Sequence, residues 1–191
     1  MMILSQRGRA VLIALMSLFL VLSCSKKETK TEGAPPDSTK KDTTLSYVSQ
    51  EVSFSVFFDE QCTKRTIKLG SREKELVIYI AVNFPETMQI AAVEYRLALP
   101  KGLAIENDKF YAERAALLGT FDAGISETFP CVVGPRIVLH ALTLNVTEEL
   151  KNAEIQLLPA ADAQFIGVAM CDHGNTLVPA GSYKAVVNPI E

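Results

Sequence analysis

Alternation of apolar and polar residues with a period of two is the feature that most constrains the fold of this chain. Within 91–99, four large apolar side chains share one parity of an extended backbone: Val93, Tyr95, Leu97 and Leu99. The other parity carries Glu94 and Arg96. Successive side chains of a strand point to opposite faces, so the pattern predicts a strand with one buried face. The tripeptide Pro100-Lys101-Gly102 then predicts a turn.

Six further segments show a strand pattern. They are 52–58, 76–82, 137–146, 154–158, 164–170 and 183–187. The segment 76–82 is largely apolar on both parities, which is typical of a central strand. Seven or more strands separated by glycine and proline turns predict an all-β fold. We expect an antiparallel β-sandwich of the jelly-roll or immunoglobulin-like kind rather than a βαβ architecture.

One segment, 110–118, has the composition of a short helix. Alanine, glutamate, arginine and leucine are good helix formers, and Gly119 follows them in the position of a C-cap. The sequence therefore predicts a helix near 110–118, with a strand as the alternative.

The N-terminus has the pattern of an export signal. Arg7 and Arg9 form a positive region, and an uncharged apolar stretch follows from Ala10 to Leu22. This stretch has the length of a signal core and is too short to span a bilayer core of ~30 Å. Residues 1–23 are therefore predicted to be a signal peptide.

The tetrapeptide Val21-Leu22-Ser23-Cys24 resembles the lipobox of bacterial lipoproteins. The resemblance implies cleavage before Cys24 and acylation of that cysteine, which would anchor the protein to a membrane of the cell envelope. Ser25 follows the cysteine, which by the same resemblance implies the outer membrane. The alternative is an ordinary secretory signal with an incidental Cys24.

Residues 24–46 are predicted to be a disordered tether. This segment is rich in lysine, threonine, serine, proline and acidic residues and has no apolar periodicity. It cannot bury enough surface to offset its ordering entropy. A flexible chain of this length has an r.m.s. span of roughly 25 Å. The remaining segment, 47–191, has a length that suits one domain with one core.

The charge balance excludes some partners. The chain from Cys24 to Glu191 holds 17 basic and 22 acidic residues, a net charge of −5. The two signs are well mixed, so the sequence indicates no nucleic-acid binding and no polybasic membrane patch. We expect contact with the membrane through the lipid, and no cofactor.

Three cysteines remain once Cys24 is set aside. Export places them in an oxidising compartment, where one intramolecular disulfide can persist and one thiol is left over. Cys131 and Cys171 both flank late strands, so this pair is the favoured bridge, with Cys62 as the free thiol. Cys62 to Cys131 is the alternative. A Cys171-Asp172-His173 metal cluster is less favoured, because zinc sites need three or four ligands.

A serine-histidine-carboxylate set can be assembled from Ser126, His140 and Asp122, but no nucleophile-elbow motif supports it. His140 lies on the apolar parity of its strand, which favours a core histidine over a general base. The acidic pairs of predicted turns are interpreted as solvated: Asp59 with Glu60, and Glu148 with Glu149.

Neither a metal site nor a sugar platform is clearly indicated. Four aspartates could offer calcium ligands from loops, but no single loop holds enough oxygens; they are Asp59, Asp108, Asp122 and Asp172. The aromatic candidates for sugar binding are Tyr47, Tyr79, Tyr95, Tyr111 and Tyr183. Tyr79 and Tyr95 are interpreted as packing residues. Phe57, on the polar parity of its strand, is either covered by a neighbouring strand, which is favoured, or part of an exposed patch.

Four stretches carry a wider resemblance. Segment 56–62 runs from a strand into an acidic turn, and 93–102 ends in a Leu-Pro-x-Gly turn. Segment 137–146 is a long late strand, and 179–188 is a closing strand. Together they resemble the cohesin-like and carbohydrate-binding-module-like β-sandwiches of secreted bacterial proteins. The resemblance implies a sandwich that works by binding, although tryptophan and a calcium loop are missing.

Three functions follow as hypotheses. The leading one is a non-catalytic protein-interaction or adhesion module that binds an envelope protein. The alternative is a carbohydrate-binding module with a glycan ligand. The further alternative is an envelope enzyme with an unrecognised site, which a deep pocket holding His140 or His173 beside a carboxylate would favour.

Overall fold

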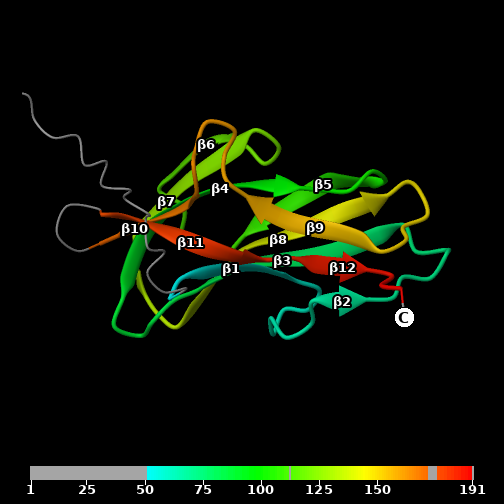
Figure 1. Ribbon diagram of the computed structural model, residues 1–191, viewed down its shortest axis with the longest axis horizontal. Helices are drawn as coiled ribbons and strands as arrows, with labels where there is room; N and C mark the ends of the chain where they lie inside the picture. Colours follow the sequence, from blue (N-terminus) through cyan, green and yellow to red (C-terminus); the bar gives the residue numbers. More distant parts are fainter. Residues whose placement is uncertain (1–50, 112, 172–175, 191) are drawn as a thin grey trace, which may run out of the picture. The chain divides into compact units, whose positions relative to one another are not determined.

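The computed structural model describes residues 51–111, 113–171 and 176–190. The signal peptide expected at 1–23 and the tether expected at 24–46 lie outside these described residues. Twelve strands occur in the described ranges (Figure 1): β1 Ser53–Phe57, β2 Thr66–Ile67, β3 Glu75–Asn83, β4 Gln89–Ala98, β5 Leu103–Phe110, β6 Ala116–Thr120, β7 Gly124–Val133, β8 Arg136–Val146, β9 Ala153–Leu158, β10 Ile166–Met170, β11 Leu177–Tyr183 and β12 Ala185–Val187. The same ranges contain no helix long and apolar enough to cross a membrane.

The strands form a β-sandwich, as predicted. One layer has the order β5-β8-β3-β1, and the other is built around β4. Strand β7 lies along one edge of β4, and β9 and β10 share the other edge. Strand β11 pairs with β10 through 177–180 and with β1 through 181–183, so it passes from one layer to the other. Most pairings are antiparallel, but β1 with β11 and β2 with β12 are parallel.

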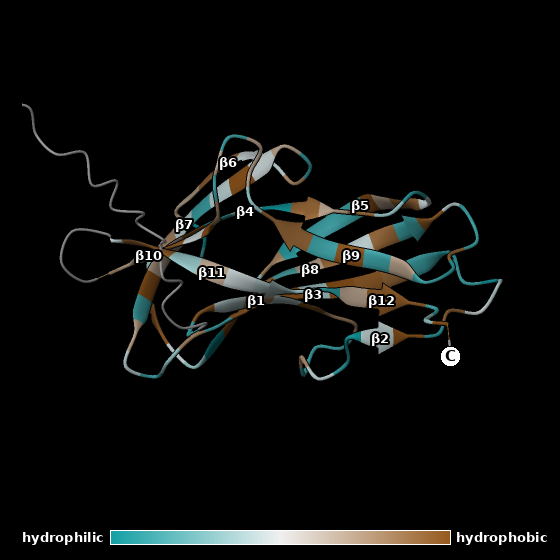
Figure 2. Cartoon of the chain, in the orientation of Figure 1, coloured by the Kyte–Doolittle hydropathy of each residue, from teal (hydrophilic) through white to brown (hydrophobic). Residues whose placement is uncertain are grey.

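The core lies between the layers, where the apolar parities of the strands meet. Figure 2 shows hydrophobic and hydrophilic residues alternating along strands such as β9. The largest fully buried side chains come from both layers and include Phe54, Ile78, Tyr95, Leu142 and Leu157. Each burial of this kind contributes roughly 1.5–3 kcal/mol relative to exposure. The tyrosine predicted to pack, Tyr95, lies with its ring 5.2 Å from that of Phe54.

The helix expected near 110–118 is absent, and this prediction was wrong. Residues 103–110 form β5, and Ala116–Thr120 pairs with Gly124–Thr128 as the hairpin β6–β7. Gly119 does have a positive φ of 86°, as a C-cap glycine would. Here the conformation serves the hairpin, because a Cβ at Gly119 would lie 2.0 Å from the carbonyl oxygen of Gly124. Nine residues are marginal for an isolated helix, so tertiary pairing decides the conformation.

The disulfide in the structure joins Cys131 to Cys171, the pair favoured from the sequence, with a Cα–Cα distance of 6.0 Å. Strands β7 and β10 pair with opposite edges of β4, so the bridge ties both neighbours across the start of β4. Cys62 is a free thiol and is buried, as expected for the cysteine left over. Burial raises the pKa of this thiol.

Candidate functional site

The outer surface of β3, β8 and β5 presents three rows of side chains that run across the strands. One row joins Tyr79 to Ala141 and Lys109, and the next joins Val77 to Thr143 and Asn107. A third row is polar at its centre and joins Glu75, Asn145 and Ala104. The opposite parities of β3 and β8 lie in the core, so these rows face outward. We call this surface, with the adjoining Tyr111, the β3–β8–β5 face.

The centre of the β3–β8–β5 face is apolar and aromatic. Val77 is 39% exposed and Tyr111 is 38% exposed. The rings of Tyr79 and Tyr111 meet edge to face with centroids 6.4 Å apart. Lys109 Nζ lies 4.7 Å from the centroid of the Tyr111 ring. Desolvation, followed by the acidic Glu60, raises the pKa of both tyrosines, so both present neutral phenols at physiological pH.

The loop after β1 bounds this face on one side. Phe57 is 6% exposed and packs with Cys62 and Ala81, so it is covered, as predicted, rather than part of an open patch. Tyr111 Oη donates to Glu60 Oε1 at 3.2 Å, which joins the loop to the end of β5. Asp59 accepts hydrogen bonds from Thr63 and the backbone of Lys64. The hydrogen bond from the Thr63 side chain is the largest cause of the lowered pKa of Asp59.

His140 is fully buried between the layers, in agreement with the interpretation as a core histidine. A β-bulge directs both Leu139 and His140 inward. Nδ1 lies 2.6 Å from Asp108 Oδ1 and forms a hydrogen bond with it. Nε2 lies 2.7 Å from Glu127 Oε1 but forms no hydrogen bond with it. The rings of Phe110 and Phe121 each lie 5.0 Å from the imidazole, edge to face.

Arg114 closes this polar cluster from the side. Its guanidinium donates to Glu127 at 3.4 Å and to Asp108 at 3.5 Å, and stacks on Phe110 at 4.1 Å. Burial, followed by the charges of Glu127 and Asp108, raises the pKa of Tyr95 well above its ordinary value. Glu127 and His140 are fully buried, whereas the side chains of Asp108 and Arg114 are 25% and 26% exposed. We call this set of four residues the buried ionic cluster, after its two buried members.

The catalytic set considered from the sequence does not assemble. The ring nitrogens of His140 face Asp108 and Glu127, whereas Asp122 accepts from Thr120 at 2.6 Å in the β6–β7 turn. That hydrogen bond is the main cause of the lowered pKa of Asp122. A carboxylate does lie within reach of His140, but a side chain with 0% exposure lacks the access that a general base needs.

The other acidic candidates lie apart. Asp59, Asp108 and Asp122 have separate partners, and Asp172 and His173 lie outside the described residues. In the part of the chain that the structure describes, no group of three His, Cys, Asp or Glu side chains is arranged to hold a metal ion.

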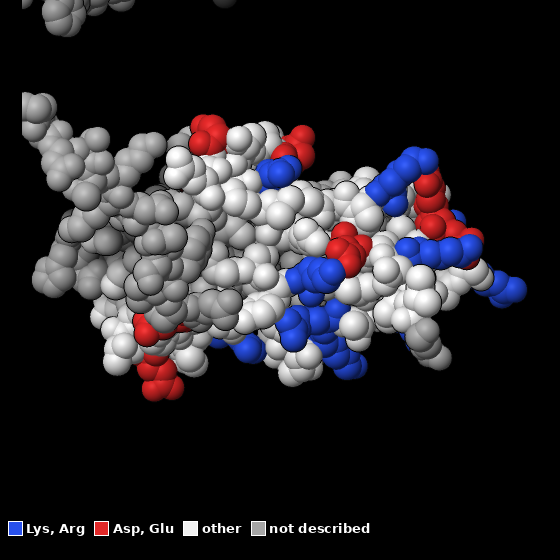
Figure 3. All heavy atoms as spheres, in the orientation of Figure 1, with Lys and Arg blue, Asp and Glu red and all other residues white. Residues whose placement is uncertain are grey.

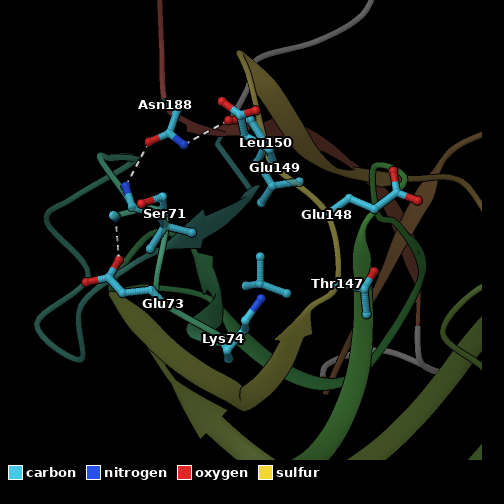
Figure 4. Close-up of a pocket in the computed structure, with 11 residues that line it drawn as sticks. Ser71, Glu73, Lys74, Thr147, Glu148, Glu149, Leu150 and Asn188 are labelled. Carbon is cyan, nitrogen blue, oxygen red and sulfur yellow. Dashed lines mark hydrogen bonds between the residues drawn. The ribbon is translucent and has the colours of Figure 1, made fainter.

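A pocket of about 350 Å³ lies between the segments 69–74 and 146–150 (Figure 4). Asn188 spans it, accepting from the backbone of Leu69 at 2.7 Å and donating to the carbonyl of Leu150 at 2.8 Å. The predicted turn pair is exposed, with Glu148 bound to Lys101 at 3.0 Å and Glu149 to Lys151 at 3.3 Å. Asn188, Glu148 and Glu149 therefore have their partners within the protein itself, and we do not assign a ligand to this pocket.

Comparison with solved structures identifies the architecture. The seventh ScaB type I cohesin of Pseudobacteroides cellulosolvens is 13% identical, with a TM-score of 0.50 over 73% of this chain and 92% of that chain. A cohesin module from a Clostridium perfringens family 33 glycoside hydrolase is 8% identical, with a TM-score of 0.53 over 74% of this chain and 100% of that chain. The third ScaB cohesin of R. flavefaciens, solved in complex with a group 1 dockerin, is 10% identical. Its TM-score is 0.51, over 75% of this chain and 98% of that chain.

This domain has the cohesin fold. No protein-family model matches the chain, and the comparison with curated proteins finds no match. At these identities the likeness concerns the fold of the cohesin-like domain and not its ligand. The β3–β8–β5 face is therefore described from its own residues.

Sequence reasoning did not identify this face, although it named Tyr79 and Tyr111 among the candidate binding aromatics. Tyr79 was interpreted as a packing residue, whereas its side chain is half-buried on the outer surface. Tyr111 fell in the segment expected to be helical. The signal that could have found the face is the outward parity of 76–82. Val77 and Tyr79 lie on this parity and are apolar or aromatic, although the other parity already supplies the buried side of the strand.

Proposed function

We propose that this protein is a lipid-anchored lipoprotein of the cell envelope whose cohesin-like domain binds a protein partner without catalysing a reaction. The observation that carries the proposal is the β3–β8–β5 face, an exposed sheet surface with an apolar, aromatic centre. Asn107, Lys109, Asn145 and Glu60 supply a polar rim around it. Protein interfaces have this arrangement, with tyrosines enriched among the residues that dominate the affinity.

The known neighbours support a protein as the partner. The R. flavefaciens cohesin was solved with a dockerin bound. By analogy of fold, we infer that this domain also binds another protein, and that it does so through the β3–β8–β5 face. The tyrosines Tyr79 and Tyr111 are the expected centre of the contact, because they bury large areas at a small cost in side-chain entropy.

Val77→Asp is expected to abolish capture of the partner, because the new charge would be desolvated at the centre of the interface. The measurement is a pull-down from envelope extract with the tagged mature chain, followed by identification of the retained proteins. The matched control is Val133→Asp, which makes the same change at a valine that is 56% exposed and lies outside the β3–β8–β5 face. A protein retained equally by wild type, Val77→Asp and Val133→Asp would contradict the proposed interface.

Anchoring through Cys24 is the second part of the proposal, and it rests on the lipobox resemblance at 21–24. Several acyl chains on one cysteine give stable membrane attachment, whereas a single chain is marginal. Cys24→Ala is therefore expected to release the protein from the membrane fraction, and wild type is expected in the outer membrane. The measurement is cell fractionation with membrane separation. Processed Cys24→Ala protein that stays wholly in the membrane fraction would contradict the proposal.

A further inference from the structure

A second depression, of about 500 Å³, lies where the chain passes from β11 to β12. Leu158 supplies an apolar contact, while Gln156, Ser182 and Tyr183 add an amide and two hydroxyls. Arg65 and Lys184 complete the lining. None of these residues belongs to the β3–β8–β5 face, so this pocket is a separate surface feature.

The backbone of Arg65 is held by a hydrogen bond, while its side-chain charge forms no ion pair with a described residue. It precedes β2, and the backbone amide of Val186 donates to its carbonyl at 2.9 Å. The guanidinium carbon lies 5.1 Å from the centroid of the Tyr183 ring. Among the described residues, no carboxylate lies within ion-pair distance of this guanidinium. Its planar set of donors is therefore available to a ligand in the pocket.

The other charges of the pocket neutralise one another. Lys184 Nζ binds Glu154 Oε1, and Gln156 Nε2 donates to Glu154 Oε2 at 2.9 Å. The hydrogen bond from Lys184 is the main cause of the lowered pKa of Glu154, so this carboxylate stays ionised and engaged. Among the described residues that line the pocket, Arg65 is left as the uncompensated cation. Figure 3 shows lysine and arginine side chains grouped in this region, over β2 and the start of β12.

We propose that this pocket binds an acidic sugar, with the guanidinium of Arg65 holding the sugar carboxylate through paired N–H donors. A carboxylate matches the planar fork of arginine, and the pair gains strength from the opposite charges. The amide of Gln156 and the hydroxyls of Ser182 and Tyr183 can exchange hydrogen bonds with sugar hydroxyls, while Leu158 contacts a C–H face of the ring. The volume lies within the ~300–1,000 Å³ range of small-molecule sites.

A sugar explains the neutral hydrogen-bonding groups, which a bare anion would leave unused. The test titrates the detergent-solubilised full-length protein with sodium glucuronate, glucose or sodium acetate at constant ionic strength, using ligand-observed NMR. Glucuronate is expected to bind at least tenfold more tightly than glucose or acetate. Equal binding of glucose would overturn the role of the carboxylate, and equal binding of acetate would overturn the assignment to a sugar.

Arg65→Gln is expected to weaken glucuronate binding at least tenfold. Arg72→Gln is the matched control, because it removes the same charge from the same basic segment but does not line the pocket. It is expected to change the affinity less than twofold. An equal loss in both variants would overturn the proposal in favour of general electrostatic attraction. Val77→Asp should leave glucuronate binding unchanged, and its loss there would contradict the independence of the two sites. Matching thermal unfolding curves establish that the variants are folded.

Discussion

Replacing Glu127 with alanine is expected to lower the free energy of unfolding by about 3–5 kcal/mol, the usual cost of breaking a buried ion pair. The carboxylate is 0% exposed and lies 2.7 Å from His140 Nε2 and 3.4 Å from Arg114 Nη2. Its loss leaves the fully buried His140 and the partly exposed Arg114 with Asp108 as their remaining carboxylate partner. Because a domain of this kind has about 5–15 kcal/mol of stability in total, the variant should be close to unfolding.

Urea unfolding followed by circular dichroism measures this change. Glu127→Gln keeps the shape and one acceptor oxygen, so a smaller loss of about 1–3 kcal/mol is expected. Glu106→Ala, at an exposed position in β5, is the control and should stay within about 0.5 kcal/mol of wild type. If Glu127→Ala unfolded within 1 kcal/mol of wild type, the buried ionic cluster would not be a stabilising feature of this domain.

Removing the Cys131–Cys171 bridge is expected to lower the stability by about 3–4 kcal/mol on the chain-entropy model. The bridge closes a loop with a sequence separation of 40 residues and so restricts the unfolded chain. The double variant Cys131→Ser/Cys171→Ser should unfold at lower urea concentration than wild type under oxidising conditions. Dithiothreitol should destabilise wild type to a similar extent and leave the double variant unchanged.

Non-reducing peptide mapping provides the covalent check on this bridge. The expected product is one linked pair of peptides, with Cys62 in a peptide that reacts with a thiol reagent only after unfolding. A linked peptide that contains Cys62, or three reactive thiols, would contradict the pairing. Cys62→Ala is the control for loss of a buried cysteine without loss of the bridge, and its response to dithiothreitol should match that of wild type.

The strands with alternating apolar residues could be predicted from the sequence. Strands β1, β3, β4, β8, β9, β10 and β12 overlap the expected segments. Their inward side chains are almost all apolar, so a period of two was visible in each. The burial of Tyr95 and His140 followed from the same parity argument, because the position of a residue in a strand determines which face of its sheet the side chain occupies.

Two of the strands that were missed, β5 and β7, carry charged side chains toward the buried His140. Glu127 interrupts the apolar parity of β7 between Ile125 and Phe129, and all three are buried. In β5, Asp108 occupies the position paired with the core residue Leu142. Read locally, both segments lack the pattern of a half-buried strand. Their inward charges are tolerated because they meet His140 and Arg114, which come from other parts of the chain.

The sequence by itself determined the all-β class, the positions of most core strands, the odd number of cysteines that remains once Cys24 is set aside, and the composition expected of a tether. Those properties depend on residue type and on short-range periodicity. Only the tertiary structure decided that 116–120 is a strand, that Glu127 and Asp108 point at His140, and that Val77, Tyr79 and Tyr111 share one outer face. Each of these requires contacts between residues distant in sequence, and the free energy of such contacts overrides local preference.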